Sequence, residues 1–137
     1  MSHPRLLLAE DHVDTAELLS DLLQAEFDVI GEVHDGLALV SAAKRLAPDV
    51  IVSDISMPGL DGIDATTAIL RNNAAARIIL VTAHSDPILM ERGLAAGALG
   101  FVLKDLAGDD LIPAVHSALR GERHVSELPY PQKRVTP

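Results

Sequence analysis

The sequence predicts an α/β domain in which a parallel sheet is covered by helices on both faces. Two observations carry this prediction. Five short apolar runs alternate with five longer helical patterns through short connections. The first, third and fourth runs are almost wholly apolar, which is typical of strands buried on both faces. The length of 137 residues suits one domain with a substantial core.

The expected strands are the short runs rich in Leu, Val and Ile. They cover residues 5–9, 28–33, 50–54, 77–82 and 100–103. The helical patterns between them cover about 14–26, 37–46, 63–72 and 87–96, and a fifth runs to about residue 120.

Local signals fix several helix ends. Asp86 followed by Pro87 gives a capping residue with proline at the first helical position. Gly97 stands where a left-handed residue ends a helix. In the first helix an apolar stripe at helical spacing is formed by Leu18, Leu19, Leu22 and Leu23.

The fifth helix contains a proline that bears on its start. If the helix began at Ala107, the missing N–H of Pro113 would interrupt the hydrogen-bonded part. If Asp110 is the cap, Pro113 falls in the first turn and no bond is lost. We therefore expect the later start. From Glu122 onward the periodicity ends and three prolines follow, which predicts an irregular tail or linker.

Composition excludes several functions. The net charge of −9 argues against nucleic-acid binding by these residues, because phosphates repel acidic surfaces. The only aromatic residues are Phe27, Phe101 and Tyr130, so a base-stacking platform or a flavin sandwich is not expected. There is no cysteine, and no apolar stretch has the length of a signal peptide or a membrane span.

Polar residues follow the strands at one end. In open α/β sheets, ligands bind at the carboxyl ends of the strands, so these positions form the candidate site. The polar residues are Glu10, Asp11, Asp54, Thr82 and Lys104, and the small residue Ala83 follows Thr82.

Four segments in order carry a resemblance: LLLAEDH, PDVIVSDISMPGLDG, RIILVTAH and GALGFVLKD. With them the chain resembles a response-regulator receiver domain of two-component systems, of the NarL/FixJ (LuxR-type) branch, along nearly all of residues 4–121. The resemblance implies a flavodoxin-like (βα)5 doubly wound five-stranded parallel sheet with strand order 2-1-3-4-5.

That order makes the first and third strands neighbours, so three carboxylates would crowd into one pocket and raise one another's pKa. A hard divalent cation would relieve the crowding. The resemblance assigns direct contacts to Asp11, Asp54 and the backbone carbonyl of Ser56, with Glu10 acting through water, and Mg²⁺ (or Mn²⁺) as the ion. His12 and His84 are expected at the rim and not as ligands.

The resemblance also implies a phosphorylation switch. Asp54 is the phosphoacceptor, a phosphohistidine on a partner kinase is the donor, and Lys104 and Thr82 contact the phosphoryl group. Ala83 and His84 flank access to the pocket. Inward movement of the Thr82 hydroxyl would let Phe101 change its packing and alter the surface of the fourth helix, fifth strand and fifth helix.

Residues 1–121 are therefore expected to form the receiver and 122–137 a linker to a C-terminal helix-turn-helix domain that is absent here. DNA would be bound only through that domain, a phosphorylation-dependent homodimer is plausible, and a bacterial cytoplasmic location without membrane contact is expected. A natural stand-alone receiver is the nearest alternative.

Two other classes remain open at this point. A dehalogenase-like phosphatase also uses an Asp nucleophile at a strand end. That family has a second Asp two residues later, whereas position 56 here is Ser. A nucleotide or flavin binder would want a Gly-rich first turn or stacking aromatics, which LLLAEDH lacks.

Overall fold

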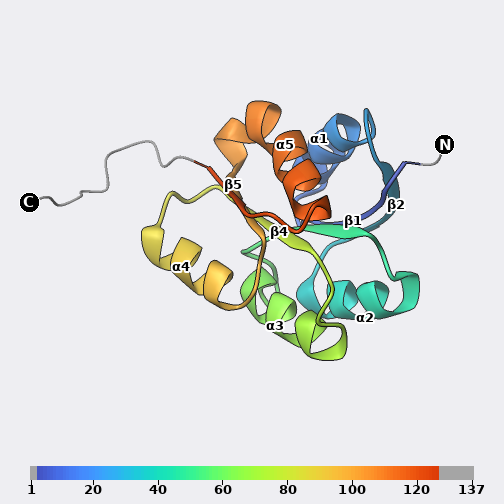
Figure 1. Ribbon diagram of the computed structural model, residues 1–137, viewed down its shortest axis with the longest axis vertical. Helices are drawn as coiled ribbons and strands as arrows, with labels where there is room; N and C mark the ends of the chain where they lie inside the picture. The colour runs from blue at the N-terminus through green and yellow to red at the C-terminus, as the bar shows by residue number, and fades with distance from the viewer. Residues whose placement is uncertain (1–2, 127–137) are drawn as a thin grey trace, which may run out of the picture.

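A computed structural model describes residues 3–126 of the chain (Figure 1). The elements in chain order are β1 (Arg5–Ala9), α1 (Val13–Leu23), β2 (Asp28–Val33), α2 (Gly36–Leu46), β3 (Val50–Asp54), α3 (Gly62–Asn72), β4 (Ile78–Thr82), α4 (Pro87–Ala95), β5 (Gly100–Leu103), the 3₁₀ helix η1 (Lys104–Leu106), α5 (Ala107–Leu119) and β6 (His124–Val125). All paired strands are parallel, in the order β2-β1-β3-β4-β5-β6. The five expected strands and their order are confirmed, and a sixth strand is added.

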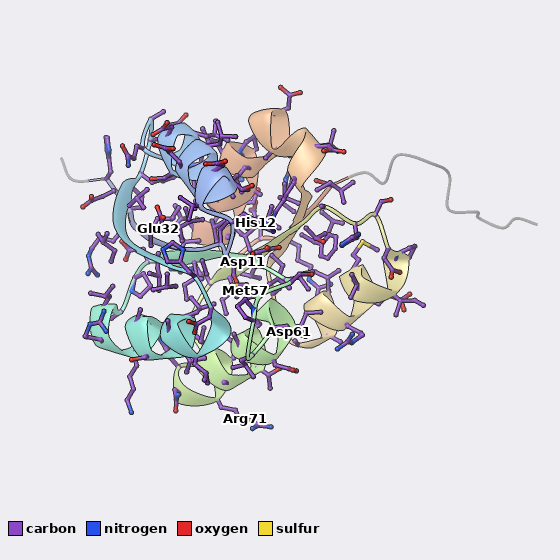
Figure 2. The ribbon with its side chains drawn as sticks, turned by 180° about the vertical axis from the view of Figure 1, so that it is seen from behind. Asp11, His12, Glu32, Met57, Asp61 and Arg71 are labelled. Carbon is purple, nitrogen blue, oxygen red and sulfur yellow. The ribbon has the colours of Figure 1, made fainter. Side chains whose placement is uncertain are left out.

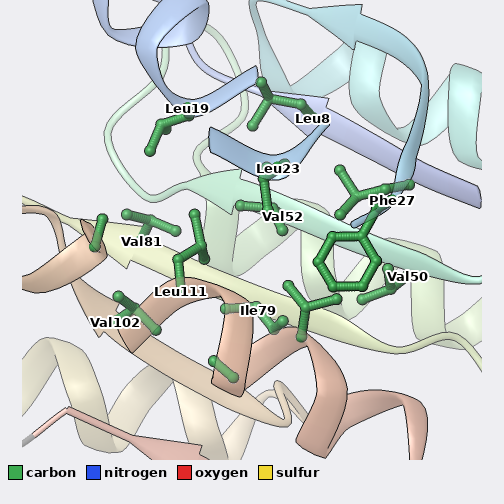
Figure 3. Close-up of a cluster of buried hydrophobic side chains, with 14 of the residues drawn as sticks. Leu8, Leu19, Leu23, Phe27, Val50, Val52, Ile79, Val81, Val102 and Leu111 are labelled. Carbon is green, nitrogen blue, oxygen red and sulfur yellow. The ribbon is translucent and has the colours of Figure 1, made fainter. Parts of the chain in front are cut away.

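The sheet separates two hydrophobic layers. Helices α1 and α5 cover one face, and α2, α3 and α4 cover the other (Figure 1). Figure 3 shows the first layer, where Phe27, Leu23 and Leu111 pack over strand side chains such as Val52 and Ile79. Strands β3 and β4 are buried along their whole length and β1 along all but its first residue, as their apolar composition predicts.

The expected helix signals are present, with one error in the apolar stripe. Asp86 caps α4 by accepting the N–H of Ile88, and Gly97 follows the helix with φ of 112°. In α1, Leu19 is buried but Leu18 is 71% exposed. The stripe prediction was wrong for Leu18 because the buried face of α1 is formed by Ala16, Leu19, Ser20 and Leu23, and Leu18 lies outside that face.

Helix α5 begins at Ala107, so the predicted start with Asp110 as the cap was wrong. Pro113 lies inside the helix on its exposed side. The carbonyl that Pro113 leaves without its helical partner belongs to Asp109, which is exposed and accessible to water. Solvation at this turn offsets part of the cost on which the later start was based.

The chain after α5 is not irregular throughout, which corrects the expected tail. Residues His124 and Val125 form β6, paired with Gly100 and Phe101 of β5. Ser126 fixes this strand: its hydroxyl donates to Asp110 Oδ2 at 2.5 Å and accepts the Leu103 N–H at 3.2 Å. Residues 127–137, the rest of the predicted linker, lie outside the described residues.

Within residues 3–126, none of the helices has both the length and the apolar character needed to cross a bilayer.

Candidate functional site

The end of β3 carries Asp54 into the interior at the carboxyl edge of the sheet. Its side chain is 5% exposed. Gly62, at the start of α3, approaches this end so closely that an added Cβ would lie 2.1 Å from the Asp54 carbonyl oxygen. Asp61 caps α3 by accepting the Asp64 N–H at 2.8 Å. The GLDG segment therefore fixes the position of the β3 end.

Lys104 joins the acids of two strands. Its Nζ lies 2.7 Å from Glu10 Oε1 and 3.3 Å from Asp54 Oδ2. Glu10 is fully buried and the Lys104 side chain is 19% exposed. Burial alone would lower the pKa of Lys104, but the two carboxylates outweigh burial and raise that pKa above its usual 10.5. The ammonium group is therefore held in its charged form between the two acids.

Asp54 is a carboxyl group whose surroundings disfavour ionisation. Burial raises its pKa most, and the neighbouring Glu10 raises it further, while Lys104 lowers it, so that the pKa of Asp54 is about 6 instead of 3.8. One lysine thus compensates two buried carboxyl groups incompletely. A perturbed acid in such a cluster is typical of a functional site.

Asp11 adds a third carboxylate at the end of β1. Its Oδ1 is buried and accepts no hydrogen bond among the described residues, although His12 Nδ1 lies 3.4 Å away. Oxygen or nitrogen atoms of Glu10, Asp11 and His12 all lie within 4.8 Å of one another, and Figure 2 shows Asp11 and His12 side by side. An acidic cluster with an unpartnered buried oxygen has the donor set that a hard divalent cation prefers, so these residues fit Mg²⁺ or Mn²⁺.

The remaining predicted residues lie around the same edge. Thr82 is buried at the end of β4, and its Oγ1 accepts the His84 N–H at 3.1 Å. Ala83 and His84 are exposed. Ser56 is exposed and donates its N–H to Asp54 Oδ1 at 3.4 Å.

Phe101 lies in the core behind the site. Its side chain is fully buried on β5. An added Cβ at Gly93 of α4 would meet Leu80 Cδ1 at 2.7 Å and Phe101 Cδ2 at 3.8 Å. Gly93 therefore permits α4 to pack closely over β4 and β5, so that Phe101 connects the sheet to that helix.

The sequence prediction missed His34 at the end of β2. Its Nδ1 lies 2.9 Å from the Glu10 carbonyl oxygen. Its position gave a usable signal, because it is also a polar residue directly after a strand of the same sheet.

Comparison with known proteins identifies the family and agrees with the described fold. Residues 6–116 match the family described as the response regulator receiver domain. The chain belongs to this family. It is the receiver domain of a two-component response regulator, and the relatives below place it with the NarL/LuxR group.

Two curated relatives show the degree of similarity. The transcriptional regulatory protein PdtaR of Mycobacterium tuberculosis is 36% identical over 125 residues, which cover 90% of this chain and 60% of PdtaR. The transcriptional regulatory protein LiaR of Bacillus subtilis is 38% identical over 120 residues, which cover 86% of this chain and 57% of LiaR. The chain therefore spans about 60% of the length of the curated relatives it matches.

Solved structures agree with the described fold. The receiver domain of the putative response regulator NarL from Mycobacterium tuberculosis is 31% identical with a TM-score of 0.82, and the match covers 89% of this chain and all of that one. A LuxR-family two-component response regulator from Aurantimonas is 30% identical with a TM-score of 0.87, covering 93% and 91% of the two chains.

Proposed function

We propose that Asp54 is the phosphoacceptor of this receiver. The single observation that carries the proposal is the contact of its buried carboxyl group with Lys104 Nζ at 3.3 Å beside the fully buried Glu10. A carboxylate in this position has a cation ready to compensate added negative charge. Neutralisation of charge and positioning are the main needs of phosphoryl transfer.

The proposed donor is a phosphohistidine of a partner histidine kinase. An Asp54 carboxylate oxygen attacks the phosphorus atom, a P–O bond forms, and the P–N bond to imidazole breaks with its electron pair leaving on nitrogen. Lys104 faces the oxygens that carry the transferred charge, and the Thr82 hydroxyl binds the new phosphoryl group. Ala83 and His84, both exposed, flank the entry route.

Glu10, Asp11, Asp54 and the Ser56 carbonyl would hold Mg²⁺ (or Mn²⁺), with Glu10 acting through water. When bound, the cation would supply positive charge for the transferred phosphoryl group in addition to that of Lys104. The unpartnered Asp11 Oδ1 supports this assignment, because a buried carboxylate oxygen without a donor is costly unless a cation approaches it.

The signal is proposed to leave the site through Thr82 and Phe101. Thr82 pairs in register with Leu103, the residue before Lys104. A shift of the Thr82 hydroxyl would therefore change the packing at the end of β5. Phosphorylation then biases a pre-existing equilibrium between two packings of α4, β5 and α5. The extra strand β6 is the outermost strand of the sheet, next to β5, and so becomes part of the output surface.

The output is proposed to be transcriptional. The relatives are named transcriptional regulatory proteins. A solved structure of the related protein RcsB shows two of its dimers bound to DNA. In this proposal the receiver of residues 1–121 is extended by β6 (His124–Val125), the rest of 122–137 leads to a DNA-binding domain, and phosphorylation favours a homodimer.

The test is incubation with acetyl phosphate and Mg²⁺ followed by intact-protein mass spectrometry. The wild type gains one phosphoryl group and Asp54→Asn gains none. Asp64→Asn is the matched control, since Asp64 is an exposed acid on α3. Phosphoryl uptake by Asp54→Asn equal to that of the wild type would disprove the assignment.

A further inference from the structure

His34 links the end of β2 to the acidic turn that follows β1. Its Nδ1 lies 2.9 Å from the Glu10 carbonyl oxygen, and the Glu10 N–H donates to the Val33 carbonyl at 3.0 Å. The Glu10 N–H is therefore held by Val33 of β2 and the Glu10 carbonyl by His34, the residue directly after β2. The His34 imidazole thus takes the place of the backbone N–H that would contact the Glu10 carbonyl if the two strands continued.

The direction of this hydrogen bond fixes where the proton lies. A carbonyl oxygen only accepts, so Nδ1 must carry the hydrogen. The other ring nitrogen, Nε2, lies 3.8 Å from Glu32 Oε2. Both the neutral Nδ1–H tautomer and the imidazolium ion satisfy the contact to Glu10, whereas the neutral Nε2–H tautomer does not.

The bond acts on Asp11 through the peptide plane. The Glu10 carbonyl and the Asp11 nitrogen belong to one planar unit, so fixing that carbonyl fixes the orientation of this peptide and the position of the Asp11 Cα atom, from which the side chain leaves the turn. The Glu10 side chain has other partners, Lys104 and the His12 N–H. Asp11 Oδ1 accepts no hydrogen bond among the described residues, and its neighbour His12 Nδ1 lies 3.4 Å away, so the backbone contributes to the place of this oxygen.

We propose that His34 is a positioning residue for the acidic pair, holding the Glu10–Asp11 peptide so that the Asp11 carboxylate points toward a divalent cation. The inference rests on the proposed function, since it concerns the cation that assists phosphorylation of Asp54. Partners that orient metal ligands from behind typically contribute 10–100-fold to metal affinity.

Two substitutions of similar shape separate the hydrogen bond from packing. His34→Asn keeps an N–H donor at the position of Nδ1, and His34→Leu has the same branching without a donor. Neither substitution introduces charge. The side chain is 52% exposed, so neither change opens a cavity in the core.

The experiment is an NMR titration of the metal-free, unphosphorylated protein with Mg²⁺, together with ¹⁵N shifts of the His34 ring. We expect His34→Leu to weaken Mg²⁺ binding about tenfold, His34→Asn to bind like the wild type, and Nδ1 of the wild type to be protonated. Equal affinity of His34→Leu and wild type, equal weakening by both variants, or an unprotonated Nδ1 would overturn the inference.

The outcomes remain separable from the proposed function. If the wild type takes up phosphoryl and His34→Leu binds Mg²⁺ normally, only the role of His34 fails. If the wild type binds no Mg²⁺, both fail. If His34→Leu does not fold, the protonation state of Nδ1 in the wild type and the affinity of His34→Asn decide the matter.

Discussion

The amino and carboxyl edges of the sheet, where the strands begin and end, place their charged side chains differently. At the amino edge, the Arg5 N–H donates to Asp49 Oδ2 at 2.7 Å, and the Arg5 guanidinium donates to the carbonyls of Ala47 at 2.9 Å and Leu46 at 2.8 Å. These charges are exposed and each has a partner. At the carboxyl edge, the Glu10 and Asp54 carboxyl groups are buried and share one lysine.

The difference separates stability from function. Exposed charged groups such as the Arg5 guanidinium and the Asp49 carboxylate, each hydrogen-bonded to the backbone, cost little to hold in place, because water screens their charge. Buried carboxyl groups with too few partners lower the free energy of unfolding. A cation that compensates their excess negative charge removes this cost when it binds, so it stabilises the folded protein. The carboxyl edge is therefore expected to respond to cations, and the amino edge is not.

The largest effect is expected when the shared cation is removed. Lys104→Met leaves two buried carboxyl groups without their partner, which costs about 3 kcal/mol of unfolding free energy when both are ionised. Phosphoryl uptake falls about 100-fold, since one charge-stabilising donor is lost. Chemical denaturation and phosphorylation rates measure the two effects. Lys44→Met, an exposed lysine on α2, is the control, and equal losses in both variants would contradict the comparison.

Addition of a cation should strengthen the carboxyl edge next. Mg²⁺ at 100 times its dissociation constant raises the unfolding free energy by about 2.7 kcal/mol. Asp11→Asn shifts this increment to higher Mg²⁺ concentration, because it removes one anionic ligand. Thermal unfolding against Mg²⁺ concentration gives the measurement. Asp14→Asn, an exposed acid in the first turn of α1, should respond like the wild type; a common response of all three proteins would speak against the site.

The smallest effect is expected at the amino edge. Asp49→Ala removes the acceptor for the Arg5 N–H and costs about 1 kcal/mol of unfolding free energy. Phosphoryl uptake and the response to Mg²⁺ remain those of the wild type. A variant with altered Mg²⁺ affinity would show that the two edges are coupled, contrary to the comparison.

The sequence predicted the parts of the fold that depend on local pattern. The five strands follow from apolar runs, and Asp86 with Pro87 marks the start of α4. The start of α5 was missed because the exposed Pro113 is tolerated where water reaches the unpaired carbonyl. Strand β6 was missed because its pairing depends on Ser126 contacting Asp110 and Leu103, distant contacts that no local pattern records.

In the site, too, the residues that were predicted are those with a local signal. Residues at the ends of β1, β3 and β5 were identified by position, and the structure brings Glu10, Asp54 and Lys104 into contact. His34 was not identified, although it too is a polar residue directly after a strand, and only the structure shows its contact with the Glu10 carbonyl. Roles in the switch, such as those of Thr82 and Phe101, concern a second state and stay predictions.

The Asp54 carboxyl group also sets a pH dependence. The folded, metal-free protein holds a proton on Asp54 more tightly than the unfolded chain does, because its pKa is raised from 3.8 to about 6. This contribution to stability is therefore complete at low pH and is lost as the pH rises from about 4 to about 6. Bound Mg²⁺ favours the ionised form and should remove the decline.

The most direct test of the central claim is the pKa of Asp54 itself, followed by ¹³C NMR of its carboxyl carbon with and without Mg²⁺. Without metal, we expect a midpoint near 6, and with Mg²⁺ a midpoint below 3.8. A midpoint close to 3.8 that does not move when Mg²⁺ is added would contradict the claim that this fold crowds acids which a cation relieves.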